Sequence, residues 1–89
     1  MLIGIDWDKT ISADIEFWKK FIALAEQHEH QCIVITGRNE SQPVDILGIP
    51  VVYAGDLLKR EAAENAGYNV SIWIDDQPGT IERCRKLNW

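Results

Sequence analysis

Four short, mainly apolar runs, three of them followed directly by a polar residue, constrain the fold of this 89-residue chain more than any other feature. The runs cover residues 1–5, 32–35, 51–54 and 70–74, and their composition is typical of buried β-strands. Segments with helical features separate them. Apolar strands that alternate with helices predict an α/β fold, a three-layer Rossmann-like arrangement of about four parallel strands flanked by helices. We expect one domain over residues 1–89, with the carboxyl ends of the strands at one edge.

The first predicted helix begins after a cap at Ser12 and runs to about His28. Its core face is expected to contain Ile15, Trp18, Ile22 and Ala25, widened by Phe17, Phe21 and Leu24. His28 and His30 fit the negative end of this helix better than a metal site.

The later helices are predicted from their caps. Asp56 is expected to cap a helix that runs to about Ala66, and Gly67 ends it in the left-handed conformation. One or two helical turns are expected within residues 39–48, and a last helix over residues 81–87.

Composition and charge exclude several classes of protein. Apolar residues make up 46% of the chain and charged residues 26%, which is the balance of a globular domain. The net charge of −5 argues against stable nucleic-acid binding, so nucleic acid would enter only as a substrate. Without a long apolar run or a secretory signal, we expect no membrane association and a cytoplasmic location. Cys32 and Cys84 are expected to be reduced thiols.

Two aspartates follow the first apolar run directly, in the pattern Asp6-Trp7-Asp8-Lys9-Thr10. In open α/β sheets, ligands bind beyond the carboxyl ends of the strands. A carboxylate pair there suits a nucleophile with an acid/base partner, provided that a cation relieves their repulsion. A solvated turn is the structural alternative, because aspartate and threonine also favour turns and helix starts.

A second acidic pair, Asp75 and Asp76, follows the fourth run. The predicted topology brings it to the same sheet edge as Asp6, Asp8 and Thr36. Because four carboxylates at one edge repel each other, a hard divalent cation is the simplest remedy, and oxygen-only ligands favour Mg²⁺. A turn before Pro78 is the alternative explanation of this pair.

Lys59 supplies the opposite charge. It falls in the first turn of the helix that Asp56 is predicted to cap, where the helix dipole disfavours a cation and where it could reach a phosphate. Lys59 and Arg60 as ordinary surface charges remain the alternative.

With these residues in place, the chain resembles phosphotransferases of the haloacid dehalogenase (HAD) superfamily. The first family motif, Asp-x-Asp-x-Thr, is matched by Asp6, Asp8 and Thr10. The second, an apolar strand that ends in threonine, is matched by residues 33–36 and followed by Gly37-Arg38. The third, a lysine at a helix start, is matched by Lys59, and the fourth, an acidic pair, by Asp75-Asp76. All four occur in order across residues 1–80.

The resemblance implies a Mg²⁺-dependent phosphomonoester hydrolase that works through an aspartyl-phosphate. Asp6 would attack the phosphorus, and Asp8 would be the general acid and base. Thr36 and the backbone near Gly37 would hold phosphoryl oxygens, while Lys59 would neutralise charge.

Substrate and metal ligands are implied in the same way. The substrate-binding set is Thr10, Thr36, Gly37, Arg38 and Lys59, with Thr10 expected to orient the loop more than to touch substrate. The metal set is Asp6, the backbone carbonyl of Asp8, and the last acidic pair, with Asp76 as the direct ligand and Asp75 as its support.

The chain also departs from the family. Members usually carry a cap domain, but residues 11–13 and 39–58 leave no room for one, so the resemblance is to a minimal capless type. Its site should be open to a phosphorylated small molecule or macromolecule, or use a partner's surface as a lid. The usual fifth strand is missing from the pattern. Trp7 is expected to face the core, with a stacking role beside the site as the alternative.

A non-catalytic or regulatory Mg²⁺-binding module that acts through a partner is the second functional hypothesis. Receiver domains gather similar residues on a parallel sheet, but in a different order along the chain. The presence of Asp8, which would release the phosphoryl group, favours the phosphatase. The sequence selects no substrate, and its four tryptophans are compatible with a homo-oligomer that buries apolar surface.

Overall fold

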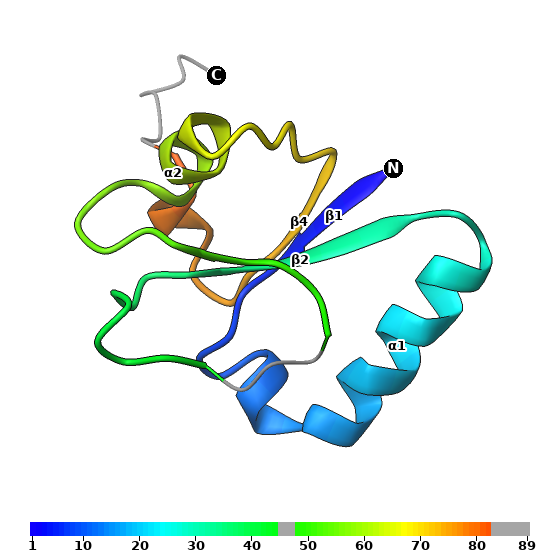
Figure 1. Ribbon diagram of the computed structural model, residues 1–89. Helices are drawn as coiled ribbons and strands as arrows, with labels where there is room; N and C mark the ends of the chain where they lie inside the picture. The colour runs from blue at the N-terminus through cyan, green and yellow to red at the C-terminus, as the bar shows by residue number, and fades with distance from the viewer. Residues whose placement is uncertain (45–47, 83–89) are drawn as a thin grey trace, which may run out of the picture.

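One parallel sheet forms the centre of the computed structural model, which describes residues 1–44 and 48–82 (Figure 1). Its strands are β1 (Leu2–Ile5), β2 (Gln31–Thr36), β3 (Val51–Tyr53) and β4 (Ile72–Ile74), in the order β3-β2-β1-β4. The helices are α1 (Ile15–Gln27) and α2 (Lys59–Asn65), with short 3-10 turns η1 (Ile11–Ala13) and η2 (Pro78–Thr80). The predicted α/β class and the four parallel strands are confirmed.

The two helices cover opposite faces of the sheet, as Figure 1 shows. Ile22 and Ala25 of α1 belong to a buried cluster with Ile5 and Val34. On the other face, α2 contributes Ala62 and Ala63 to a second cluster, which contains Ile33 and Ile35. Successive residues of β2 thus face different clusters, as expected for a strand buried on both sides. The layers are compatible with the predicted Rossmann-like arrangement.

Strand register determines which polar residues come together. Ile5 of β1 lies opposite Val34 of β2 and Ile74 of β4. The residues that follow β1 and β4, Asp6 and Asp75, therefore leave the sheet at the same edge, and the Asp6 N–H donates to the Ile74 carbonyl at 2.9 Å.

Helix α1 begins later than the sequence predicts. Asp14 is its N-cap, and the Asp14 carboxylate accepts a hydrogen bond from the Phe17 N–H at 3.2 Å. The prediction of Ser12 as the cap is wrong, because the Ser12 hydroxyl instead accepts from the Lys9 N–H at 2.9 Å and closes the preceding turn. The helix ends at Gln27, with His28 as its C-cap, close to the predicted end.

The expected apolar face of α1 is too wide. Ile22 and Ala25 are buried, and Ile15, Trp18 and Phe21 pack against the core as expected. Phe17 and Leu24, however, are 53% and 56% exposed. The sheet is narrow and covers only part of the circumference of this 13-residue helix. Phe17 and Leu24, at the margins of the expected apolar face, therefore remain at the surface.

Helix α2 also differs at its start. Leu58, not Asp56, is the N-cap and makes no side-chain capping bond, so the Asp56 prediction is wrong. Lys59 is nevertheless in the first turn, as predicted. Gly67 has a φ of +89°, which confirms the predicted left-handed end of this helix.

The remaining connections contain less helix than expected. Residues 39–44 form no helix, and residues 45–47 of the predicted helical turns lie outside the described part of the chain. The predicted last helix over 81–87 also falls mostly outside it, and residues 81–82 are not helical. Among the described residues, no helix has the length and apolarity that crossing a membrane requires.

Candidate functional site

Asp6 occupies the buried centre of the candidate site. It directly follows β1, and its exposed fraction is 6%. Its Oδ1 accepts a hydrogen bond from Lys59 Nζ at 2.7 Å, and its Oδ2 accepts one from the Thr10 hydroxyl at 3.2 Å. Thr10 lies one turn further along the same loop and thereby fixes the carboxylate. This contact fits the expectation that Thr10 orients the loop.

Lys59 joins the two strand ends electrostatically. Besides its contact with Asp6, its ammonium lies 2.6 Å from Asp75 Oδ2. The exposed fractions of the side chains of Lys59, Asp6 and Asp75 are 6%, 5% and 2%, so this ion triad is almost fully removed from water. The interpretation of Lys59 as an ordinary surface charge is therefore wrong.

Charge around the triad is unbalanced once the neighbouring Asp76 is included. Burial raises the pKa of the Asp6 carboxyl above its ordinary value; the ion pair with Lys59 opposes this, and the neighbouring carboxylates of Asp76 and Asp75 reinforce it. For Lys59, burial alone would lower the pKa, but hydrogen bonds to Asp6 and Asp75 outweigh burial and raise it. One ammonium among three carboxylates leaves excess negative charge, which a further cation would relieve.

Asp8 lies in a separate, more exposed ion pair. Arg38 Nε donates to both carboxylate oxygens of Asp8, at 3.2 and 3.1 Å, and Arg38 Nη2 donates to Oδ1 at 2.6 Å. The Arg38 side chain is 35% exposed and that of Asp8 49% exposed. These hydrogen bonds from Arg38 hold the pKa of the Asp8 carboxyl below its ordinary value.

Thr36 is the last residue of β2, and Gly37 follows it directly before Arg38 of this pair. Thr36 is completely buried, and its hydroxyl oxygen accepts a hydrogen bond from the Arg38 N–H at 3.2 Å. Gly37 is exposed, and a side chain at this position would meet open space. The second predicted motif thus forms a compact turn that aims the Arg38 side chain at Asp8.

The acidic residues fit a hard divalent cation. Asp6, Asp75 and Asp76 each offer one oxygen, and these oxygens lie within 4.8 Å of one another. With Mg–O distances of about 2.1 Å, two oxygens on one ion are at most about 4.2 Å apart, so a small contraction suffices. Asp75 is already engaged by Lys59 and by the Gln77 N–H, at 2.6 and 2.9 Å. Asp76 is exposed and is the more accessible ligand.

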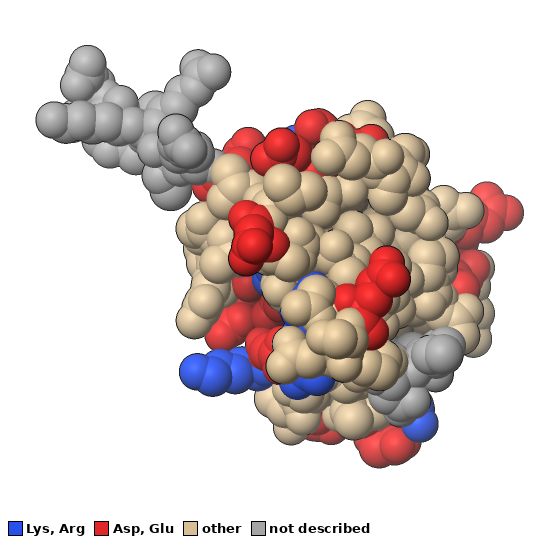
Figure 2. Space-filling view, turned by 60° about the vertical axis from the view of Figure 1, so that its left-hand side comes forward, with Lys and Arg blue, Asp and Glu red and all other residues tan. Residues whose placement is uncertain are grey.

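The surface above the strand ends carries acidic and basic side chains close together (Figure 2). Trp7 takes no part in this surface, since it is 6% exposed and belongs to the α1-side cluster, which confirms that it faces the core. No described segment forms a cap domain, because η1 leads directly into α1 and residues 37–44 form no helix or strand.

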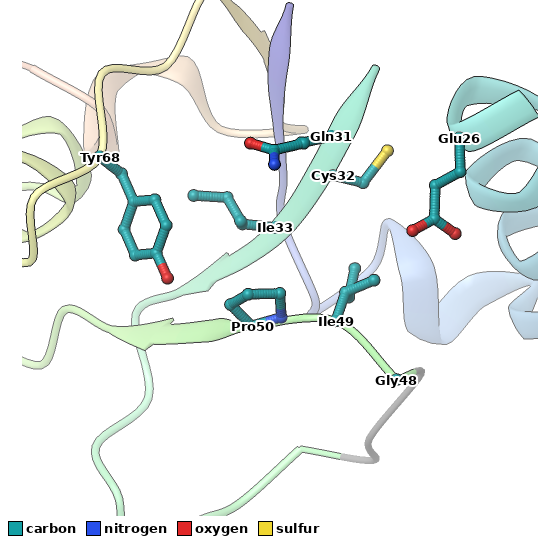
Figure 3. A pocket seen from close by; sticks show the side chains of 8 residues that line it. All are labelled: Glu26, Gln31, Cys32, Ile33, Gly48, Ile49, Pro50 and Tyr68. Atoms are coloured by element: carbon teal, nitrogen blue, oxygen red, sulfur yellow. The ribbon is translucent and has the colours of Figure 1, made fainter. Parts of the chain in front are cut away.

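A cavity of about 310 Å³ lies at the opposite end of β2 and β3 (Figure 3). Cys32, Ile49 and Pro50 are among its lining residues. Burial raises the pKa of the Cys32 thiol, with the Glu26 carboxylate as a smaller cause, so the reactive thiolate is disfavoured there. This cavity contributes nothing to the acidic site.

Comparisons with protein-family models, with curated proteins and with solved structures find no match to this chain. Functional inference therefore depends on its own residues and their geometry.

Sequence reasoning identified every residue of the ion triad but missed two contacts. It did not anticipate that Arg38 would bind Asp8 rather than stand free for a ligand, nor that Thr10 would bond to Asp6. The spacing of Thr10, four residues after Asp6, is the only signal for the second contact. The first joins residues 30 positions apart and has no local signal.

Proposed function

We propose that the chain is a Mg²⁺-dependent phosphatase of the HAD type that hydrolyses phosphomonoesters through an aspartyl-phosphate on Asp6. The observation that carries this proposal is the buried ion triad, in which Lys59 lies 2.7 Å from Asp6 and 2.6 Å from Asp75. A buried lysine held between two carboxylates at a strand edge needs a chemical reason, because burying three charges is costly. Neutralising a phosphoryl group on Asp6 is such a reason.

The chain's own residues divide the work in this proposal. The Asp6 carboxylate attacks the phosphorus, and the bond from phosphorus to the leaving oxygen breaks. Asp8, once it has taken up a proton from solvent, gives that proton to the leaving oxygen and then takes a proton from the water that cleaves the aspartyl-phosphate. Thr36 and the Gly37 backbone hold phosphoryl oxygens, and Lys59 balances their charge.

Asp6, Asp76 and the backbone carbonyl of Asp8 would hold Mg²⁺, with Asp75 as support. When bound, the ion supplies positive charge that screens the repulsion between the carboxylates and an incoming phosphate. Asp75 fits the supporting role because Lys59 and the Gln77 N–H already occupy its oxygens.

A regulatory module that accepts or binds a phosphoryl group and acts through a partner is the second candidate. One observation favours it: both oxygens of Asp8 are engaged by Arg38, so the group that would complete hydrolysis is occupied. Such a module would form a long-lived phosphoprotein on treatment with acetyl phosphate.

The decisive experiment is hydrolysis of p-nitrophenyl phosphate by wild type and by Asp6→Asn, each with Mg²⁺ and with a chelator. We expect metal-dependent hydrolysis by wild type and a loss of about a thousandfold or more in the variant, since the nucleophile is removed. Asp56→Asn is the matched control, because it removes the same charge from an exposed residue that is not a member of the triad.

Equal rates for wild type and Asp6→Asn would refute the proposal. A wild-type protein that is inactive but keeps a stable phosphoryl group after acetyl phosphate treatment would establish the regulatory candidate instead.

A further inference from the structure

The Arg38–Asp8 pair stands out because one guanidinium contacts both oxygens of one carboxylate. Three N–H···O contacts of 2.6 to 3.2 Å join the guanidinium to the two Asp8 oxygens. This fork-like geometry is also the one with which arginine binds phosphate. While the pair is closed, both Asp8 oxygens accept hydrogen bonds from the guanidinium, which favours the ionised carboxylate over the protonated form that a general acid needs.

The pair is nevertheless open to solvent. Its side chains are 35% and 49% exposed, so dissolved ions screen its attraction and an incoming anion can reach the guanidinium. A phosphate monoester at neutral pH carries more charge than a carboxylate and offers more acceptor oxygens. It should therefore compete well with Asp8 for the guanidinium.

The main chain of Arg38 is held in place on both sides. Its N–H donates to the Thr36 hydroxyl at 3.2 Å, and its carbonyl accepts from the Gly55 N–H at 3.2 Å. Gly37 presents no side chain in the way. The guanidinium is thus free to reorient by rotation of its side chain alone, from a fixed base at the end of β2.

We propose that Arg38 is a substrate-binding residue that exchanges between two anions, the Asp8 carboxylate in the absence of substrate and the phosphoryl group when substrate binds. Transfer of Arg38 to the phosphoryl group frees Asp8 for proton transfer, so the acid/base group becomes available only when its substrate is present. This inference rests on the proposed function and adds to it a means of substrate-linked control.

The test is a double-mutant cycle on the affinity for inorganic phosphate, measured by calorimetry with Mg²⁺ present. The four proteins are wild type, Asp8→Asn, Arg38→Gln and the double variant. We expect Arg38→Gln to weaken phosphate binding about tenfold, since a charge-assisted hydrogen bond is lost, and Arg38→Lys to recover part of it.

The exchange is tested by the coupling between Arg38 and Asp8, that is, by whether the effect of Asp8→Asn on phosphate affinity depends on Arg38. With Arg38 present, Asp8→Asn should tighten phosphate binding about fivefold, because the competing anion is gone; with Arg38→Gln it should change binding less than about twofold. Equal tightening in both backgrounds would mean simple charge repulsion by Asp8 and would overturn the exchange. A phosphate affinity that is the same for wild type and Arg38→Gln would also overturn the exchange.

Arg60→Gln is the matched control. Arg60 is similarly exposed, at 38%, and its Nε lies 3.0 Å from a Glu82 carboxylate oxygen rather than near Asp8. We expect it to leave phosphate affinity unchanged. This cycle measures phosphate binding and not hydrolysis, so the two proposals can fail separately. If the coupling is found but the protein hydrolyses no phosphomonoester, only the phosphatase proposal is refuted. If the protein hydrolyses phosphomonoesters but shows no coupling, only the exchange is refuted.

Discussion

Asp6 and Asp8 stand two residues apart in the sequence, yet their surroundings are opposite. Asp6 is buried, and burial raises its pKa, whereas hydrogen bonds from Arg38 lower the pKa of the half-exposed Asp8. A pair of acids in different environments suits two different chemical roles. In the proposed mechanism, however, a lowered pKa does not suit an acid that must donate a proton, so Arg38 would have to leave Asp8 before that step. Exchange of Arg38 onto a phosphoryl group resolves this conflict.

Substitution of Lys59 by methionine tests the buried triad. Lys59→Met leaves Asp6 and Asp75 as buried, uncompensated charges, so we expect the free energy of unfolding to fall by about 3–5 kcal/mol in urea denaturation. Lys19→Met removes a cation from an exposed pair with Glu16 and should cost less than about 0.5 kcal/mol. A loss below about 1 kcal/mol for Lys59→Met would contradict the buried triad.

The residues of the triad were predictable because each follows a recognisable strand or starts a helix. Once β1 and β4 are parallel neighbours, Asp6 and Asp75 must meet at one edge. The contact of Arg38 with Asp8 was not predictable, because it depends on the side-chain rotamers of two residues in different loops. A sequence pattern predicts which residues lie at one edge of the sheet. It does not predict with which of several nearby carboxylates a lysine or arginine forms an ion pair.

At the scale of helices and strands, the sequence predicted which elements exist better than where they begin. Ser12 and Asp14 are both good capping residues, two positions apart. The structure uses Ser12 to close the turn after Asp8 and Asp14 to start α1, a choice set by the path of the loop. Asp56 is likewise not the N-cap of α2. It lies in a turn that is closed by a hydrogen bond from the Leu57 N–H to the Ala54 carbonyl, and the helix begins after Leu58.

Asp14→Ala tests this assignment of the start of α1. It removes the acceptor for the Phe17 N–H, so we expect thermal or urea denaturation to show a loss of about 1 kcal/mol. Ser12→Ala is the informative comparison. If Ser12 were the true cap, the losses would be reversed, with the larger one at Ser12.

For the whole molecule, size and charge make stability sensitive to bound cations. The chain has 89 residues and a net charge of −5, and its described residues form a sheet of four strands. A domain this small buries a limited apolar core, so its margin of stability is narrow. Three acidic side chains within 4.8 Å of one another add local repulsion to that narrow margin.

Mg²⁺ should therefore raise the thermal unfolding midpoint of the whole domain. An ion that binds only the folded chain, at ten times its dissociation constant, adds about 1.4 kcal/mol of stability. For a domain of this size that corresponds to a rise of roughly 5–10 °C, measurable by circular dichroism. Asp76→Asn should abolish most of the rise, because it removes the accessible acidic ligand, whereas Asp56→Asn should preserve it. A midpoint that responds equally to Mg²⁺ in both variants would place the ion away from this edge of the sheet.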